Sequence, residues 1–103
     1  MTRKEIEDMA KLGPLPSENC RDIELLNEYE RLYRAIQKPV SDMEARVLVR
    51  LFGTDGSFGL ASALMHLIET APGWPLKDCL VDLSNEWVVE LRNRCIRGGL
   101  LSQ

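Results

Sequence analysis

Residues 58–71 constrain the fold more than any other part of the chain, because they form an almost wholly apolar segment between two breaks. Glu69 is the one charged residue in this segment, and His66 is the only histidine in the chain. A helix with so little polar surface is buried on most of its faces. The turn sequence GTDGS precedes the segment and Pro72 follows it. These signals predict a helix that ends at Ala71 and lies at the centre of a domain.

The composition predicts a single globular domain over residues 1–103. Hydrophobic residues make up 45% of the chain and charged residues 28%, as is usual for soluble proteins. No stretch comes near the roughly 20 apolar residues that a membrane-spanning helix needs. The charged N-terminal residues are not followed by the apolar core of a signal peptide. We therefore expect a cytoplasmic protein with no membrane partner.

The charge distribution argues against a nucleic-acid partner. The net charge is −3, whereas phosphate binding needs clustered lysines and arginines. Residues 41–70 show the pattern of helix, turn and helix, but the second helix is too apolar to contact base edges. The acidic surplus lies mainly in residues 39–81, which predicts a weakly acidic face.

Capping patterns and breaks predict five helices and no strand. Thr2 and Glu5 have the spacing of a capping box, which opens a first helix that ends at Gly13. Ser17 is expected to cap a second, amphipathic helix, and Ser41 with Glu44 forms the capping box of a third. The apolar stripe predicted for the second helix consists of Leu25, Leu26, Tyr29, Leu32, Tyr33 and Ile36.

The last two helices follow the turn at residues 53–57. Gly53 ends the third helix, and either Asp55 or Ser57 caps the apolar helix. Trp74 and Pro75 lead into the fifth helix, because proline suits the first helical position. Its predicted stripe consists of Leu76, Leu80, Leu83, Trp87, Leu91 and Cys95.

These stripes predict an all-α fold, a compact bundle of about five helices with a central apolar helix. The second and fifth helices are expected to pack against the apolar helix through their own stripes. Gly98 and Gly99 end the last helix and leave a short tail.

No motif for catalysis, metal binding or cofactor binding is present in the sequence. With one histidine, the chain cannot form a catalytic triad or an HExxH zinc site by itself. We expect His66 to be structural and to hydrogen-bond Ser62 or a backbone carbonyl. The glycines near residue 55 follow no strand and precede no lysine, so they do not form a phosphate-binding loop. Three widely spaced cysteines, Cys20, Cys79 and Cys95, are typical of reduced thiols.

A binding role therefore fits the sequence better than an enzymatic one. Acidic side chains speed association with a basic partner, and a few aromatic side chains supply affinity. Trp74 is the aromatic residue best placed for contact, because it lies in a turn; alternatively, it folds over the next helix as a hydrophobic staple. The predicted partner-binding residues are Asp55, Phe58, Glu69, Trp74, Asp78 and Asp82.

Residues 51–75, LFGTDGSFGLASALMHLIETAPGWP, resemble segments of small bacterial immunity proteins from toxin–immunity systems, such as those of contact-dependent growth inhibition. The resemblance implies an inhibitor that binds a cognate toxin domain, often a nuclease, and has no catalytic activity or cofactor. It transfers no functional residue. The alternative is a self-associating structural or adaptor protein, and a third hypothesis is an enzyme in which His66 lies in an open pocket beside a cysteine or carboxylate.

Overall fold

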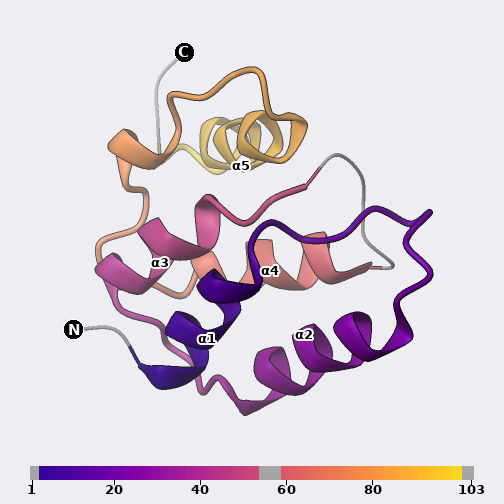
Figure 1. The fold of residues 1–103 in the computed structure, drawn as a ribbon. Helices are drawn as coiled ribbons and strands as arrows, with labels where there is room; N and C mark the ends of the chain where they lie inside the picture. Colours follow the sequence, from indigo (N-terminus) through magenta and orange to yellow (C-terminus); the bar gives the residue numbers. More distant parts are fainter. Residues whose placement is uncertain (1–2, 54–58, 101–103) are drawn as a thin grey trace.

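The computed structural model describes residues 3–53 and 59–100, and this part of the chain is all-α with no strand. The elements in order are α1 (Lys4–Leu12), α2 (Ile23–Ala35), α3 (Asp42–Val49), α4 (Leu60–Ile68), the 3₁₀ turn η2 (Lys77–Cys79) and α5 (Glu86–Arg97). Figure 1 shows these helices packed into one compact body. The predicted all-α fold with five helices is confirmed.

The first three helices begin at different kinds of N-cap. The N-cap of α1 is Arg3, whose side chain makes no capping hydrogen bond. The sequence predicted Thr2 as the cap, but the helix begins one residue later than that, and Thr2 itself lies outside the described residues. Asp22 caps α2 by accepting a hydrogen bond from the backbone N–H of Leu25. Ser17, the predicted cap, instead accepts from the N–H of Asn19 in a local turn. Such short-range bonds compete with helix formation, which explains why the second helix starts later than predicted.

The predicted capping box of α3 is confirmed. The Ser41 hydroxyl accepts from the N–H of Glu44 at 3.1 Å, and the Glu44 carboxylate accepts from the N–H of Ser41 at 2.8 Å. The helix ends at Val49, before Gly53. A Cβ on Gly53 would lie 2.4 Å from the carbonyl oxygen of Leu15, so glycine is needed there for close backbone approach.

The predicted fifth helix is two elements rather than one. Leu76 and Leu80 are buried beside η2, but residues 80–85 then form a non-helical linker, which we call the α5 linker. Leu83, a predicted core residue, is 57% exposed in this linker. The N-cap of α5 is Asn85, whose side chain accepts from two backbone N–H groups, so Pro75 does not open the helix. An apolar spacing of three or four residues is compatible with a turn as well as with a helix.

The main helix contacts follow the order α2, α1, α3, α4 and α5. In Figure 1, α5 lies at the top and α2 at the bottom, with α1, α3 and α4 between them; α3 contacts both α1 and α4. The sequence predicted that α2 packs against α4. Its main contacts are instead with α1. Tyr29, Leu32 and Ile36 of the predicted α2 stripe are nevertheless buried.

The apolar helix α4 packs between α3 and α5 and buries most of its surface. Its N-cap is Gly59, with φ of 90°; Asp55 and Ser57, the predicted caps, lie outside the described residues. The helix ends at Ile68, and a turn leads to the buried Ala71. The buried side chains of α4 are Ala61, Leu64, Met65, Leu67 and Ile68.

Candidate partner-binding groove

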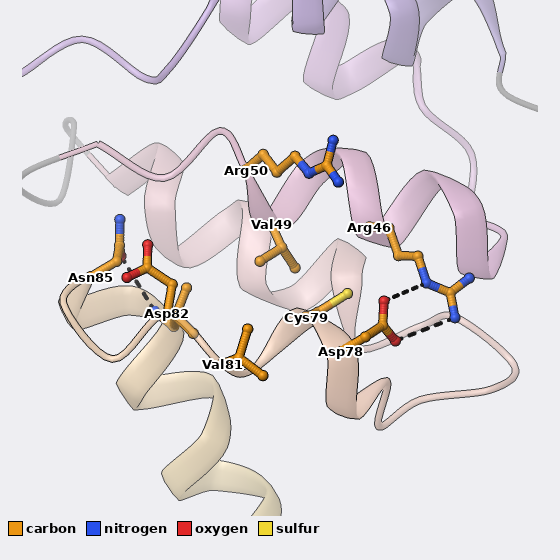
Figure 2. A pocket seen from close by; sticks show the side chains of 9 residues that line it. Arg46, Val49, Arg50, Asp78, Cys79, Val81, Asp82 and Asn85 are labelled. Carbon is orange, nitrogen blue, oxygen red and sulfur yellow. Dashed lines mark hydrogen bonds and ion pairs between the residues drawn. The ribbon is translucent and has the colours of Figure 1, made fainter.

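A pocket of about 310 Å³ lies between α3 and the segment that leads into α5. Figure 2 shows the side chains around it, and we call this pocket the α3 groove. It is lined by Arg46, Val49, Arg50, Asp78, Cys79, Val81, Asp82, Asn85 and Val88. The groove therefore joins two parts of the chain that are about 30 residues apart in the sequence.

One wall of the groove is the C-terminal half of α3. Arg46 and Arg50 are four residues apart, so they lie on one face of the helix. Arg46 forms an ion pair with Asp78 of η2, with Nε 2.9 Å from Oδ2 and Nη2 3.4 Å from Oδ1. This contact lowers the pKa of the Asp78 carboxyl. The pair thus links η2 to α3 and leaves neither charge free.

The opposite wall is the α5 linker, which internal hydrogen bonds hold in place. Asp82 Oδ1 accepts from both the N–H and the hydroxyl of Ser84. Asn85 Oδ1 accepts from the N–H of Trp87 at 2.9 Å, while its Nδ2 donates to the carbonyl of Phe52 at 3.3 Å. The rings of Phe52 and Trp87 are stacked, with centroids 6.2 Å apart. These contacts anchor the start of α5 to the chain after α3.

Two charges of the groove have no partner of opposite sign among the described residues. Arg50 is exposed, and within the described chain its guanidinium makes no hydrogen bond or ion pair. Asp82 is also exposed and forms no ion pair within residues 3–53 and 59–100. Val81, the residue before Asp82 in the linker wall, is 75% exposed. The groove thus combines a cation and an anion that lack ion-pair partners within residues 3–53 and 59–100 with open aliphatic surface.

Cys79 lines the groove but is not a candidate nucleophile. Burial raises the pKa of its thiol, and the charge of Asp78 raises it further, while Arg46 and Arg50 act in the opposite direction. The net effect disfavours the thiolate, which is the form that nucleophilic attack needs.

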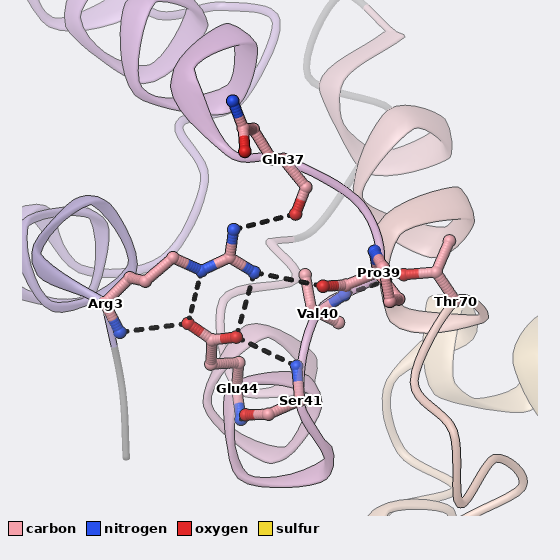
Figure 3. A network of polar contacts seen from close by, with 7 residues as sticks. All are labelled: Arg3, Gln37, Pro39, Val40, Ser41, Glu44 and Thr70. Carbon is pink, nitrogen blue, oxygen red and sulfur yellow. Dashed lines mark hydrogen bonds and ion pairs between the residues drawn. The ribbon is translucent and has the colours of Figure 1, made fainter.

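The other end of α3 carries a buried cluster centred on Arg3 and Glu44, shown in Figure 3. Glu44 is 3% exposed, and its carboxylate accepts from Arg3 Nε at 2.9 Å, Arg3 Nη2 at 3.0 Å and the Arg3 backbone N–H at 2.9 Å. Arg3 also donates to the carbonyls of Gln37 and Pro39. These bonds, chiefly that from the Arg3 side chain, lower the pKa of Glu44 from 4.5 to about 2 despite its burial. We call this set the Arg3–Glu44 cluster.

The six predicted partner-binding residues do not form one site. Asp78 and Asp82 both line the α3 groove. Glu69 instead pairs with Arg94 of α5 through two 2.8 Å contacts. Trp74 is half-buried against the core. Asp55 and Phe58 lie outside the described residues.

The environment of Trp74 fits the alternative prediction that it folds over the next helix. Burial raises the pKa of the Cys95 thiol, and a hydrogen bond with the Trp74 side chain opposes that increase. Because Cys95 is in α5, the indole lies against this helix. Trp74 is therefore at least partly a structural residue.

Sequence reasoning missed the arginines of the groove and the exposed valine. The spacing of Arg46 and Arg50 on one helical face was visible in the sequence. Val81 was left out of the predicted stripe of the fifth helix, but no sequence signal marked it as a binding residue. The ion pairs of Glu69 and Asp78 also weaken the predicted acidic face, since both carboxylates are neutralised within the molecule.

His66 lies on the exposed strip of α4 rather than in the core. Its side chain is 57% exposed, and Nδ1 is 4.0 Å from Glu69 Oε1. The expected hydrogen bond to Ser62 is not formed among the described residues, and both side chains are exposed. The Glu69 carboxylate beside His66 is held by Arg94. Within the described part of the chain, no three side chains of the metal-ligating types lie close enough to hold an ion.

Comparisons with protein-family models, with curated proteins and with solved structures gave no match to this chain. None of the helices in residues 3–53 and 59–100 has the length and apolar character required to cross a bilayer.

Proposed function

We propose that this protein is a protein-binding module, an immunity-type inhibitor of a toxin domain, and that the α3 groove is its contact face. The observation that carries the proposal is the composition of the groove: Arg50 and Asp82 lack internal ion-pair partners among the described residues, and Val81 is 75% exposed beside Asp82. Protein interfaces combine apolar contact with polar groups that the partner completes.

Internal contacts also hold the two walls of the groove in place, which favours binding without large rearrangement. The Asn85 side chain connects α5 to the carbonyl of Phe52, and the Arg46–Asp78 pair connects η2 to α3. A surface that is already ordered loses little conformational entropy when a partner binds. The toxin partner itself comes from the resemblance of residues 51–75 to immunity proteins.

The direct test uses the reading frame next to the gene of this protein in its source genome. The C-terminal domain encoded there is expressed alone and together with this protein, and growth of the host cells is measured. Restored growth, together with a complex of the two purified proteins in titration calorimetry, is the expected result. Growth inhibition that is unchanged by co-expression would contradict the proposed role.

The exposed aliphatic residues of the α5 linker support a second candidate, a self-associating subunit. Val81 and Leu83 are 75% and 57% exposed and are two residues apart in the linker. Sedimentation equilibrium over a range of concentrations distinguishes the two functions. If the protein is a monomer at all concentrations, self-association is excluded. If it forms a dimer that Val81→Asp dissociates, this face serves self-association rather than toxin binding.

A further inference from the structure

We infer that the α3 groove recognises a segment of a partner protein that carries a carboxylate for Arg50, an aliphatic side chain for the valines and a cation for Asp82. This inference rests on the proposed function and specifies the chemistry of the partner. It is argued from the charges and the apolar surface of the groove, taken one at a time.

Arg50 sets the position of the partner's carboxylate. Its neighbour one turn earlier, Arg46, already has Asp78 as its partner, whereas the Arg50 guanidinium makes no hydrogen bond or ion pair within the described residues. A guanidinium binds a carboxylate or a phosphate through two parallel hydrogen bonds. Asp82 also lines the groove and has no ion-pair partner among the described residues, and its negative charge repels a phosphate dianion more strongly than a single carboxylate. A carboxylate is therefore the favoured group.

The apolar lining sets the position of an aliphatic side chain. Val49 and Val88 are 8% and 3% exposed at the pocket, and Val81 is open to solvent on the opposite wall. Covering an exposed valine removes apolar surface from water, which favours association. A pocket of about 310 Å³ is large enough for a side chain of this kind but is at the lower end of small-ligand sites.

Asp82 sets the position of the cation. Its Oδ1 is used by Ser84, while no hydrogen bond to its Oδ2 is present among the described residues. Figure 2 shows Asp82 beside Asn85 at one end of the pocket and the Arg46–Asp78 pair at the other, with Arg50 along α3 between them. A lysine or arginine of the partner near Asp82 and an acidic residue near Arg50 complement this arrangement.

The first experiment selects 12-residue peptides from a random displayed library on the wild-type protein. The expected peptides carry an acidic, an aliphatic and a basic residue, and they bind Arg50→Glu at least tenfold more weakly in fluorescence anisotropy. Replacing the acidic residue of such a peptide by lysine is expected to restore binding to Arg50→Glu. Peptides without an acidic residue, or with equal affinity for both proteins, would overturn the inference.

Matched variants control for folding and for general charge effects. Arg21→Glu makes the same change at another exposed arginine, just before α2, and is expected to bind the peptides like the wild type. Arg50→Gln removes the charge without reversing it, and it takes the place of Arg50→Glu in the binding measurements if Arg50→Glu unfolds. Circular dichroism verifies that each variant is folded. An Arg21→Glu loss equal to that of Arg50→Glu would also overturn the inference.

The second experiment uses the toxin domain from the growth test as the probe. If the wild type and Arg50→Glu protect cells and bind the toxin equally, the groove chemistry is wrong while the inhibitor role stands. If neither protects, the inhibitor role fails, and the peptide selection still tests the groove by itself. Binding of duplex DNA that Arg50→Glu abolishes, or dimerisation through the groove, would overturn the inference in favour of those partners.

Discussion

The two ends of α3 differ in how completely their charges are satisfied. At the N-terminal end, Glu44 is buried and accepts hydrogen bonds from Arg3 and Ser41. At the C-terminal end, Arg50 is exposed and has no internal partner among the described residues. A charge can be buried only when its partners are supplied, so the first end contributes to stability. The second end leaves its charge available to another molecule.

The largest expected effect is the loss of the Arg3–Glu44 cluster. Glu44→Ala leaves Nε of Arg3 and the N–H of Ser41 without their acceptor, and we expect it to lower the free energy of unfolding by about 3–4 kcal/mol, measured by urea denaturation. Glu7→Gln, at an exposed position of α1, is the control and is expected to change it by less than about 0.5 kcal/mol. Equal effects of the two variants would contradict the contrast between buried and exposed charges.

The same cluster predicts a loss of stability in acid. The pKa of Glu44 is about 2 in the folded protein and 4.5 ordinarily, so its stabilising contribution is complete above about pH 5. This contribution, on the order of 3 kcal/mol, is lost as the pH falls toward 2. We expect the difference in unfolding free energy between the wild type and Glu44→Gln to shrink over this range. A difference that is independent of pH would show that the carboxylate charge has no role.

The next effect concerns the close backbone contact between Gly53 and Leu15. Gly53→Ala places a Cβ 2.4 Å from the carbonyl oxygen of Leu15, and we expect it to destabilise the protein by about 1–3 kcal/mol in thermal unfolding. Gly98→Ala is the matched control, because its Cβ would be 3.3 Å from the nearest backbone oxygen, that of Arg94. If Gly98→Ala destabilises the protein as much as Gly53→Ala, the contact with Leu15 does not explain the result.

The smallest effect on stability is expected in the groove. Asp78→Asn removes the ion pair with Arg46, but the two side chains are 61% and 42% exposed, so solvent and salt screen their interaction. We expect an unfolding curve close to that of the wild type, with the remaining difference reduced in 1 M salt. A loss as large as that of Glu44→Ala would show that the groove, too, is part of the stabilising framework.

Local signals explain which elements of the fold could be predicted. The capping box of α3 involves residues three apart, so the sequence alone contains all of its information. The burial of α4 follows from its lack of polar residues. The start of α5 was not predicted, because the spacing of Leu76, Leu80 and Leu83 fits both a helix and a turn. Only the packed structure shows that Leu83 lies outside the core.

The candidate site depended on contacts between distant residues. Of the six predicted residues, Asp78 and Asp82 line one groove, whereas Glu69 is paired with an arginine 25 residues later in the chain. Sequence spacing cannot show which charges are neutralised by such partners. The groove residues Arg50 and Val81 became candidates only when the structure showed them exposed.

The amino-acid pattern by itself was sufficient for the helical class, for the buried apolar helix and for the cap at Ser41, because each depends on residues within a few positions. The tertiary structure decided that Glu44 is completed by Arg3, 41 residues away, and that Arg50 has no comparable partner within the described chain. The physical reason is that burial and ion pairing depend on distances between residues far apart in the sequence. A charge pattern can supply candidates for a binding face, but the pairing of charges in space determines which remain free.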